Sequence, residues 1–163
     1  MTIVECSSGS STIILARAAE LNGEGHVYSL EHEAVFAEKT RQELARYGLS
    51  HRATVLDAPL VRQNINGKER LWYDFAGLPD AGIDMVVIDG PPLSIGDLAR
   101  YPAGPVLFPQ LSAGGKVFLD DAAREEETEI TKLWAAEFPD LQLSTENCEK
   151  GCNVLSRPPV DGA

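Results

Sequence analysis

The sequence predicts an α/β fold: a doubly wound, mostly parallel sheet with helices on both faces and an antiparallel hairpin strand at its C-terminal end. Short apolar runs alternate with longer stretches of helical period, which is the pattern of parallel strands joined by helices. The stretch LQLSTENCEKGCNVLSRP contains two strand-like runs around a turn, which predicts the antiparallel addition. The buried parallel strands are expected at TIVEC (2–6), HVYSL (26–30), ATVL (53–56), DMVVI (84–88) and KVFL (116–119).

Two helices are expected between the first three strands. The stretch STIILARAAELNG follows the first strand, and Gly23 is placed to end it. The stretch HEAVFAEKTRQELARYG follows the second strand, and Gly48 is its stop. The apolar period predicts a buried stripe of Ile14, Leu15, Ala18, Ala19 and Leu21 in the first helix and of Val35, Phe36, Leu44 and Tyr47 in the second.

The later connections are less regular. The stretch REEETEITKLWAAEF predicts a third helix whose first turn is solvated and matched to the helix dipole by Glu125, Glu126, Glu127 and Glu129. Residues 59–83 contain the turn-like NINGKER but no clean period, and we interpret them as a short helix and a loop. The prolines of RYPAGPVLFPQLSAGG predict a helix that is short or kinked at Pro109.

Length and composition limit the class of protein. The chain has 163 residues, 44% of them hydrophobic and 24% charged, which predicts one globular domain over 1–163. The formal net charge of −11 would repel a phosphate backbone, so no nucleic-acid partner is expected. No apolar run reaches the roughly 18 to 20 residues of a membrane span, so we expect no membrane partner and a cytoplasmic location. The three cysteines, expected to be reduced, are Cys6, Cys148 and Cys152.

A carboxylate ends or follows each of the five strand-like runs. In an open parallel sheet the carboxyl ends of the strands line the ligand crevice, so these acids should gather along one edge. Any one of them alone is explained by a turn or a helix cap. Together they form a rim that suits a cationic or hydroxyl-rich ligand and repels a phosphate. The acids are Glu5, Glu31, Asp57, Asp89, Asp120 and Asp121.

The loop after the first strand limits the class of ligand that the site could bind. The stretch VECSSGSST contains neither a GxGxxG nor a GxxxxGK[ST] pattern, which disfavours a pyrophosphate and a mononucleotide phosphate. Glu31 follows Gly9 at about the 20-residue offset at which an acid binds a ribose. A carboxylate accepts hydrogen bonds from both vicinal ribose hydroxyls. The ligand is therefore expected to have a ribose but no pyrophosphate, as in S-adenosylmethionine.

Five stretches of the chain, in this order, resemble the class I S-adenosylmethionine-dependent methyltransferases: VECSSGSST, VYSLEHE, VLDAPL, IDMVVIDGPP and GGKVFLDDA. More narrowly, the chain resembles the small-molecule O-methyltransferase branch related to catechol O-methyltransferase. The resemblance covers nearly the whole chain. It implies a Rossmann-like sheet, S-adenosylmethionine as cofactor, and methyl transfer to an oxygen of a small-molecule or sugar acceptor.

The resemblance also assigns site residues. The first loop departs from the family at Ser7, where the family usually has glycine. Asp89 is the one candidate catalytic residue, and it lies on the cofactor side as well. The cofactor-binding residues implied are Glu5, Ser7, Gly9 and Ser11 in the first loop, Glu31 at the ribose, Asp57 and Ala58 beside the adenine, and Asp89.

A divalent cation is the second cofactor that the resemblance implies. Asp89, Asp120 and Asp121 match the residues that hold it in the metal-dependent branch, and three carboxylates suit a hard cation such as magnesium. The stretch DGPP after Asp89 lacks the lysine base that those enzymes often have. The rival interpretation places Asp89 against the sulfonium side of the cofactor and makes Asp121 a cap of the last helix.

Several functional alternatives stay open. Trp72, Tyr73, Arg100 and Tyr101 are candidates to shape an acceptor pocket, although core packing explains Trp72 equally well. In the resembled family one or more helices precede the first strand, so the lid is missing here, supplied by a partner, or built from residues 59–80. A homodimer is plausible because the missing cover would expose apolar surface. The competing functions are a cofactor-binding domain without turnover and a nicotinamide-dependent oxidoreductase.

Overall fold

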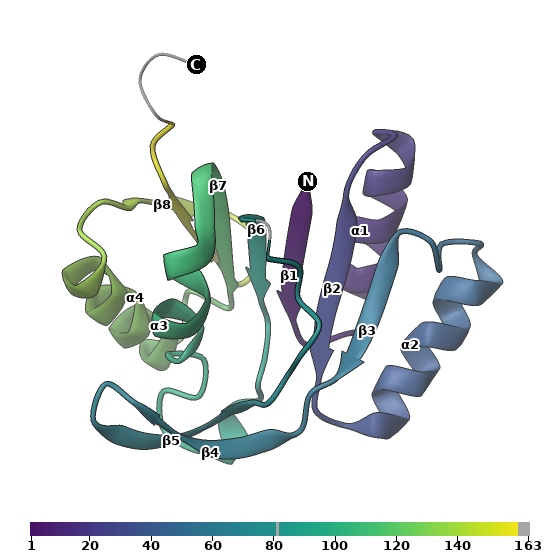
Figure 1. Ribbon diagram of the computed structural model, residues 1–163. Coiled ribbons are helices and arrows are strands. Elements are labelled where there is room, and N and C mark those ends of the chain that lie inside the picture. Colours follow the sequence, from purple (N-terminus) through teal and green to yellow (C-terminus); the bar gives the residue numbers. More distant parts are fainter. Residues whose placement is uncertain (81, 160–163) are drawn as a thin grey trace.

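The computed structural model describes residues 1–80 and 82–159. Its main sheet has seven strands in the order β3-β2-β1-β6-β7-β9-β8, in which the first five pair in parallel and β9 pairs antiparallel with both β7 and β8 (Figure 1). All five predicted parallel strands and the C-terminal hairpin are confirmed. The strands are β1 (Thr2–Cys6), β2 (His26–Glu31), β3 (Ala53–Asp57), β6 (Ile83–Ile88), β7 (Leu111–Asp120), β8 (Gln142–Glu146) and β9 (Cys152–Ser156).

Strand order creates the place where a ligand is expected. From β1 the chain winds outward to β2 and then β3, whereas β6 pairs with the other edge of β1. The carboxyl ends of β1 and β6 are therefore the point at which the winding reverses, and open α/β sheets bind ligands at such a point. Val4 of β1 and Val86 of β6 face each other across this switch and are fully buried.

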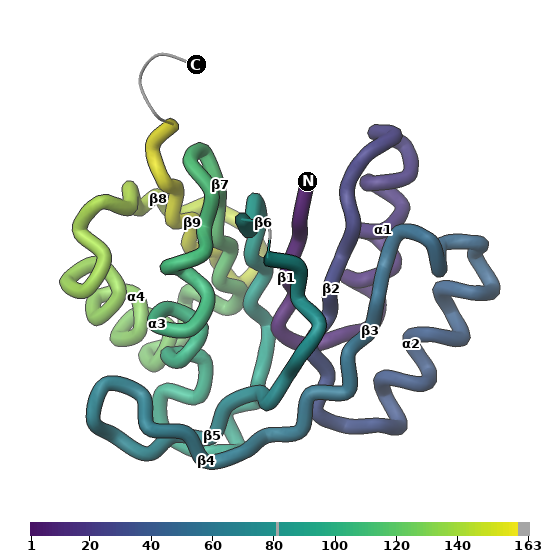
Figure 2. The backbone as a smooth tube through the Cα atoms, viewed as in Figure 1, coloured from purple at the N-terminus to yellow at the C-terminus, as the bar shows by residue number. Residues whose placement is uncertain are grey.

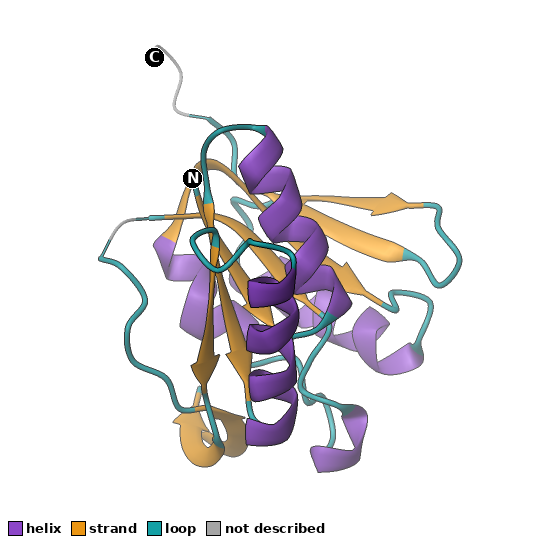
Figure 3. Cartoon of the chain, turned by 90° about the vertical axis from the view of Figure 1, so that its right-hand side faces the viewer, coloured by secondary structure: helices purple, strands orange, loops and turns teal. Residues whose placement is uncertain are grey.

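The helices lie in two groups around the sheet. The helices α1 (Ser10–Leu21) and α2 (Ala34–Arg46) lie beside the half formed by β1, β2 and β3, and α3 (Ala103–Leu107) and α4 (Glu125–Glu137) lie beside the other half (Figures 1 and 3). Short 3-10 turns occupy η1 (Leu93–Ile95) and η2 (Phe108–Gln110). The expected short helix before Pro109 is confirmed, because α3 passes directly into η2. Among the described residues no helix is both long and apolar enough to cross a membrane.

The predicted inner faces of α1 and α2 are largely wrong. Leu21 of α1 and Val35 of α2 are 79% and 77% exposed, and Ile14, Ala18, Phe36 and Tyr47 are exposed too; Leu15 is half-buried, and only Ala19 and Leu44 of the predicted stripes are buried. The inner faces instead carry small or hydroxyl side chains: Thr12, Ala16 and Ala19 in α1, and Ala37, Thr40 and Leu44 in α2.

Hydrogen bonds of hydroxyl groups explain why these side chains, and not the predicted apolar stripes, face the sheet. Thr12 of α1 donates to the buried carboxylate of Glu5 at 2.5 Å, which turns that side of α1 toward the sheet. Thr40 of α2 lies 3.1 Å from Ser8, in the loop after β1. An apolar period counts only apolar side chains, so it missed the polar contacts that orient both helices.

The first part of the segment 59–83 corrects the sequence interpretation, because residues 60–73 form a second, two-stranded sheet instead of a short helix. The strands β4 (Leu60–Ile65) and β5 (Lys68–Tyr73) pair antiparallel around a turn at Asn66 and Gly67. Both turn residues have positive φ, 51° and 79°, which is the type I′ geometry that Asn-Gly favours. The hairpin crosses the molecule beyond the carboxyl ends of the parallel strands (Figure 2). A lid built from residues 59–80 stays one of the three alternatives, and the hairpin lies on the side of the molecule that such a lid would cover.

The hairpin is held there by the larger of two hydrophobic clusters. Trp72 and Tyr73 of β5 are buried and pack with residues of β6, β7, α3 and α4. The second cluster lies between α1, α2 and the strands β1 to β3. Core packing, the alternative reading of Trp72, is the one that the structure supports.

Candidate active site

The predicted acids do reach one edge of the sheet, but they divide into two groups. Glu5, Glu31 and Asp57 belong to the half formed by β1, β2 and β3, and we call this the cofactor half. Asp89, Asp120 and Asp121 lie at the ends of β6 and β7, and we call this the acceptor half. The two groups have different partners, which are described in turn.

The loop after β1 has an unusual backbone at its first residue. Ser7 has a φ of 111°, and its N–H donates to the carbonyl of Leu30 in β2 at 3.0 Å. This is a conformation that glycine adopts without steric cost and serine does not. The serine that stands in place of the family's usual glycine therefore keeps a glycine-like backbone, and the loop is closed against β2 as it would be with glycine. Gly9, two residues later, has a φ of 133°.

Glu5 fastens the start of the loop instead of presenting a free carboxylate. Its Oε2 accepts hydrogen bonds from the hydroxyls of Thr12 in α1 and Ser29 in β2, both at 2.5 Å. Burial raises the pKa of Glu5, and the hydroxyl hydrogen bonds oppose that rise. Glu5 thus joins β1, β2 and α1 behind the loop through Oε2, and its buried Oε1 accepts no hydrogen bond from the described residues.

Glu31 lies beside the loop, as the ribose hypothesis requires. It is buried, its Oε2 accepts a hydrogen bond from Ser8 at 2.7 Å, and its Oε1 accepts one from the backbone N–H of Glu33 at 3.0 Å. His32 Nδ1 also lies 3.2 Å from Oε1, so of the about four lone-pair directions of a carboxylate, the one on Oε2 that Ser8 does not occupy is left for a ligand hydroxyl. A ribose hydroxyl bound here would either displace the Ser8 hydroxyl from Glu31 or form a hydrogen bond with it.

The residues after β3 flank Glu31 mainly through the backbone. Ala58 is fully buried, and its N–H donates to the carbonyl of Glu31 at 2.8 Å. The Asp57 carboxylate is largely exposed and pairs with Arg41 of α2 at 2.9 Å. The end of β3 is therefore fixed next to the expected ribose site, with the Asp57 side chain turned toward α2.

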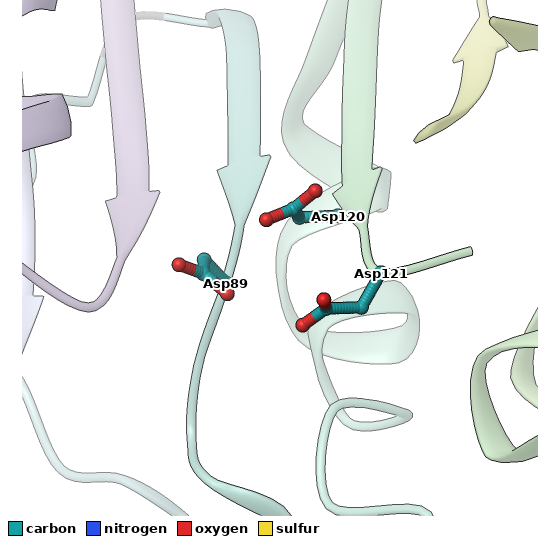
Figure 4. A group of neighbouring side chains, drawn as sticks. All are labelled: Asp89, Asp120 and Asp121. Atoms are coloured by element: carbon teal, nitrogen blue, oxygen red, sulfur yellow. The ribbon is translucent and has the colours of Figure 1, made fainter. Parts of the chain in front are cut away.

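In the acceptor half the three aspartates converge as expected. One carboxylate oxygen from each of Asp89, Asp120 and Asp121 lies within 4.8 Å of the other two (Figure 4). Asp121 has a φ of 57°, in the left-handed region that Asp and Asn tolerate better than most residues. Its side chain does not cap α4, so the capping role considered for Asp121 is wrong.

A buried arginine joins this cluster, and its role was not foreseen from the sequence. Arg100 is 3% exposed, and its Nη2 donates to the carbonyl and the Oδ1 of Asp89 at 2.9 and 3.0 Å. The same Nη2 lies 3.4 Å from Oδ2 of Asp121, and Nη1 donates to the carbonyl of Asp120 at 3.2 Å. One guanidinium thus links the ends of β6 and β7. It does not line an acceptor pocket, which corrects the expectation for Arg100.

Further charges complete the cluster around Asp121. Arg124 Nη1 lies 2.8 Å from Asp121 Oδ2, and Lys150 Nζ lies 3.6 Å from Asp121 Oδ1. Glu127 of α4 is fully buried, 3.4 Å from Arg100 Nη1. The prediction of a solvated first turn is therefore wrong for Glu127, because the glutamate run faces the cluster at that position. Burial raises the pKa of Glu127, and Arg100 and Arg124 oppose the rise.

Asp89 is the most accessible acid of the acceptor half that also contacts Arg100. Its side chain is 51% exposed. Burial of its inner part raises the pKa of Asp89, Arg100 lowers it, and the neighbouring Asp120 and Asp121 raise it further. With Oδ1 engaged by Arg100, its second oxygen is left for a ligand.

The residues of the acceptor half do not fit the divalent cation that the resemblance implies. Both oxygens of Asp121 face cationic side chains of the chain itself, and Oδ1 of Asp89 accepts from Arg100. An ion bound by all three aspartates would lie beside a guanidinium that is buried and held by two backbone carbonyls. The guanidinium and the ion would carry the same sign of charge, so the ion would have to compete with Arg100 for the oxygens of Asp89 and Asp121.

A groove runs along the sheet from these acids, next to α1. It is lined on one side by Leu15 of α1 and on the sheet by half-buried apolar residues, and it ends at Asp89 and Asp120. Its volume is about 430 Å³, which is in the range of small-molecule sites. The lining residues are Ser11, Leu15, Met85, Val87, Asp89, Phe118, Asp120 and Cys152.

Of the aromatic residues considered for an acceptor pocket, Trp72 and Tyr101 lie elsewhere, whereas the buried Tyr73 hydroxyl, which has no hydrogen-bond partner among the described residues, lies next to the Gly90 backbone. Trp72 and Tyr73 are in the core, and the Tyr101 hydroxyl donates to Glu137 at 2.8 Å and accepts from Asn66 at 2.9 Å. That expectation is therefore wrong for Trp72 and Tyr101. The sequence contained a signal for the groove residues that was not used. Met85 and Val87 alternate along one correctly predicted strand and Phe118 lies on the next, so their side chains could have been expected on one face of the sheet.

Comparison with known proteins identifies the family. The family described as a methyltransferase domain matches residues 4–122, which include every acid of the edge. The chain belongs to this methyltransferase family. The sequence matches no protein of curated function.

Solved structures share the fold of this methyltransferase. A methyltransferase from Podospora anserina, PaMTH1, bound to SAH, is 15% identical with a TM-score of 0.67, and the match covers 94% of this chain and 70% of that chain. The O-methyltransferase TomG from Streptomyces achromogenes, in complex with SAM, is 18% identical with a TM-score of 0.64, covering 96% and 73%. A candidate rRNA methylase from Clostridium thermocellum is 17% identical with a TM-score of 0.67, covering 99% and 88%. The predicted Rossmann-like class I methyltransferase fold is confirmed.

Proposed function

We propose that this methyltransferase uses S-adenosylmethionine to methylate a hydroxyl oxygen of a small molecule. The observation that carries the proposal is that the loop from Ser7 to Ser11, which lacks the glycine patterns of phosphate-binding loops, lies beside the buried acid Glu31. The loop lies at the switch point of the sheet, between Glu31 at the end of β2 and Asp89 of the acceptor half after β6. TomG and PaMTH1, which share the fold, are seen with SAM and SAH, and this supports the same cofactor here.

Each residue of the cofactor half receives a role in this proposal. Glu31 binds the ribose hydroxyls, and the end of β3 at Asp57 and Ala58 flanks the adenine. The loop from Ser7 through Gly9 and Ser11 approaches the amino-acid end of the cofactor. Glu5 acts from behind, since its hydrogen bonds to Thr12 and Ser29 hold the loop against the sheet.

The transfer itself is an in-line displacement. Held by the residues of the cofactor half, S-adenosylmethionine would supply the methyl group to the acceptor oxygen and would leave as the neutral thioether S-adenosylhomocysteine. The acceptor's hydroxyl proton passes to the free oxygen of Asp89. The raised pKa of Asp89 makes it a better base than an ordinary aspartate. Most of the rate gain comes from holding the two reactants in line.

The groove and the charge favour a small acceptor over RNA. The groove offers apolar walls that end at two carboxylates, which suits an apolar body with a hydroxyl at one end. RNA is the competing substrate, because the candidate rRNA methylase shares the fold. The net charge of −11 opposes binding of a phosphate backbone over most of the surface.

Calorimetry with S-adenosylhomocysteine tests the cofactor site. The wild-type chain is expected to bind, and Glu31→Ala to bind at least about tenfold more weakly, because each lost hydrogen bond to a charged group is worth about 1.5–3 kcal/mol. Glu33→Ala is the matched control, because it removes a neighbouring exposed acid without touching Glu31 Oε2. Circular dichroism confirms that each variant is folded. No binding by the wild type, or equal binding by Glu31→Ala, contradicts the proposal.

The two competing functions, an oxidoreductase and a binding-only domain, predict different experimental results. An oxidoreductase would enhance NADH fluorescence on mixing, and a binding-only domain would bind S-adenosylhomocysteine yet turn over no acceptor of a broad panel. The expected homodimer stays a prediction, which light scattering of the purified chain decides. The exposed apolar side chains of α1 and α2, such as Val35 and Leu21, are consistent with it.

A further inference from the structure

We propose that Arg100 takes the place of a divalent cation in the acceptor half, so that this methyltransferase holds its site together without a bound metal. The proposal rests on the proposed function for the location of the acceptor site, but its main test does not depend on turnover. Arg100 acts as a positioning residue. At 3% exposure its guanidinium is covered by the carboxylates that it organises.

The first step is the number and placement of the contacts that Arg100 makes. Its guanidinium donates to the backbone carbonyls of Asp89 and Asp120, which are the ends of two neighbouring parallel strands. It also pairs with the carboxylates of Asp89, Asp121 and Glu127 at 3.0, 3.4 and 3.4 Å. A bound cation would join carboxylates in the same way. Here the planar fork of a guanidinium joins them, with directed hydrogen bonds.

The second step is that Arg100 is fixed in place by its own backbone. The N–H of Ala103, at the start of α3, donates to the carbonyl of Arg100 at 3.1 Å, and the N–H of Tyr101 donates to the carbonyl of Leu98 at 2.9 Å. The Tyr101 carbonyl in turn accepts from the indole of the buried Trp134 at 2.9 Å. The arginine therefore enters the cluster from a segment that is anchored in the core.

The third step is that the carboxylates need this charge. Asp121 and Glu127 are buried, and buried carboxylates without a cationic partner are strongly unfavourable. Among the described residues, neither oxygen of Glu127 accepts a hydrogen bond, so its compensation comes from Arg100 at 3.4 Å and Arg124 at 3.8 Å. Arg100 is the only one of these cations that also reaches Asp89.

The consequence concerns the free oxygens at the end of the groove. By engaging Oδ1 of Asp89 and the carbonyls at both strand ends, Arg100 directs the remaining Asp89 oxygen and the Asp120 side chain toward the groove. A substrate hydroxyl then meets oriented carboxylate acceptors, and no ion has to be bound first. Loss of Arg100 should free the three aspartates and create the metal site that the wild type lacks.

The test is manganese binding to the metal-stripped full chain, followed by electron paramagnetic resonance and by thermal shift. The wild type is expected to show no saturable binding below about 1 mM Mn²⁺, which is weaker than ordinary carboxylate sites for hard cations. Arg100→Gln is expected to bind Mn²⁺ at least about tenfold more tightly, because the ion replaces the missing guanidinium charge. Mn²⁺ should also raise the melting temperature of Arg100→Gln and leave that of the wild type unchanged.

Control variants separate the position of the charge from its amount. Arg124→Gln removes one positive charge from the same Asp121, but this arginine is 43% exposed and leaves Arg100 in place, so this variant, like the wild type, should show no saturable binding below about 1 mM Mn²⁺. The double variant Arg100→Gln with Asp121→Asn should lose the gained binding. Arg100→Lys keeps a charge without the fork, and is expected to bind no Mn²⁺ and to melt at a lower temperature than the wild type.

Each outcome decides for or against the proposal. Saturable micromolar Mn²⁺ binding by the wild type overturns it, as does an equal gain in Arg124→Gln and Arg100→Gln. If Arg100→Gln does not fold without metal, recovery of its far-ultraviolet circular dichroism on adding Mn²⁺ supports the proposal and failure to recover opposes it. Failure of the proposed function is distinguishable, because it appears as absent S-adenosylhomocysteine binding, whereas failure of the present proposal appears as wild-type Mn²⁺ binding with cofactor binding intact.

Discussion

The cofactor half and the acceptor half of the sheet edge both contain buried carboxylates, but they stabilise them in different ways. In the cofactor half, Glu5 and Glu31 accept hydrogen bonds from serine and threonine hydroxyls and from backbone N–H groups. In the acceptor half, Asp121 and Glu127 depend on arginine charges. Neutral donors keep a carboxylate in place with short-range, directional bonds, whereas a guanidinium compensates several carboxylates at once.

The difference predicts which half is more sensitive to a single substitution. Removal of one hydroxyl from the cofactor half leaves the other donors in place. Removal of Arg100 from the acceptor half leaves several acids without compensation, because one side chain serves Asp89, Asp121 and Glu127. The acceptor half is therefore expected to be the more fragile of the two, and the following measurements test that expectation.

The largest effect is expected from Arg100→Met. It should lower the free energy of unfolding by about 3–5 kcal/mol, because breaking a buried ion pair from one side leaves uncompensated charge. Urea unfolding followed by circular dichroism measures the change, with Arg124→Met as the exposed control, expected to cost about 1 kcal/mol or less. Equal losses in the two variants would show that the acceptor half does not depend on Arg100.

A smaller effect, visible mainly in its pH dependence, is expected from Glu5→Gln. Burial raises the folded-state pKa of Glu5, so the folded chain binds a proton there more readily than the unfolded chain. The contribution of Glu5 to stability is therefore greatest below its unfolded pKa and falls as pH rises through its folded pKa. The stability of the wild type relative to Glu5→Gln should decrease from about pH 4.5 upward toward neutrality. Urea unfolding at several pH values measures this difference, and a difference that increases with pH would contradict the assignment.

The smallest effect is expected from the loop itself. Ser7→Gly should raise the free energy of unfolding by about 1 kcal/mol, because it removes the steric cost of a positive φ on a residue with a Cβ. Gly9→Ala should lower it by about 1–3 kcal/mol for the converse reason, since a Cβ there meets open space and only backbone strain counts. S-adenosylhomocysteine binding by Ser7→Gly should match the wild type. A destabilised Ser7→Gly would mean that the hydroxyl has a contact that offsets the strain.

Much of the architecture was predictable because it depends on local pattern. The apolar runs at 2–6, 26–30, 53–56, 84–88 and 116–119 became the parallel strands, and the turn between Gln142–Glu146 and Cys152–Ser156 became the antiparallel hairpin. Helix faces were less predictable. Thr12 and Thr40 face inward because of hydroxyl contacts to residues of other elements, and apolar periodicity does not register such contacts. The Asn66-Gly67 turn was detected, but the pairing of its two flanking strands was not.

By itself, the sequence determined that acids stand at the ends of parallel strands, because strand position and sheet direction together place them on one edge. Only the tertiary structure decided what each acid does. Arg100 is separated in the chain by 11 residues from Asp89 and by 21 from Asp121, and it meets these acids and Glu127 because β6, β7 and α4 converge around the turn before α3. Whether a carboxylate binds a ligand or an internal cation depends on which donors packing brings within a few ångströms, and that information is not local in the chain.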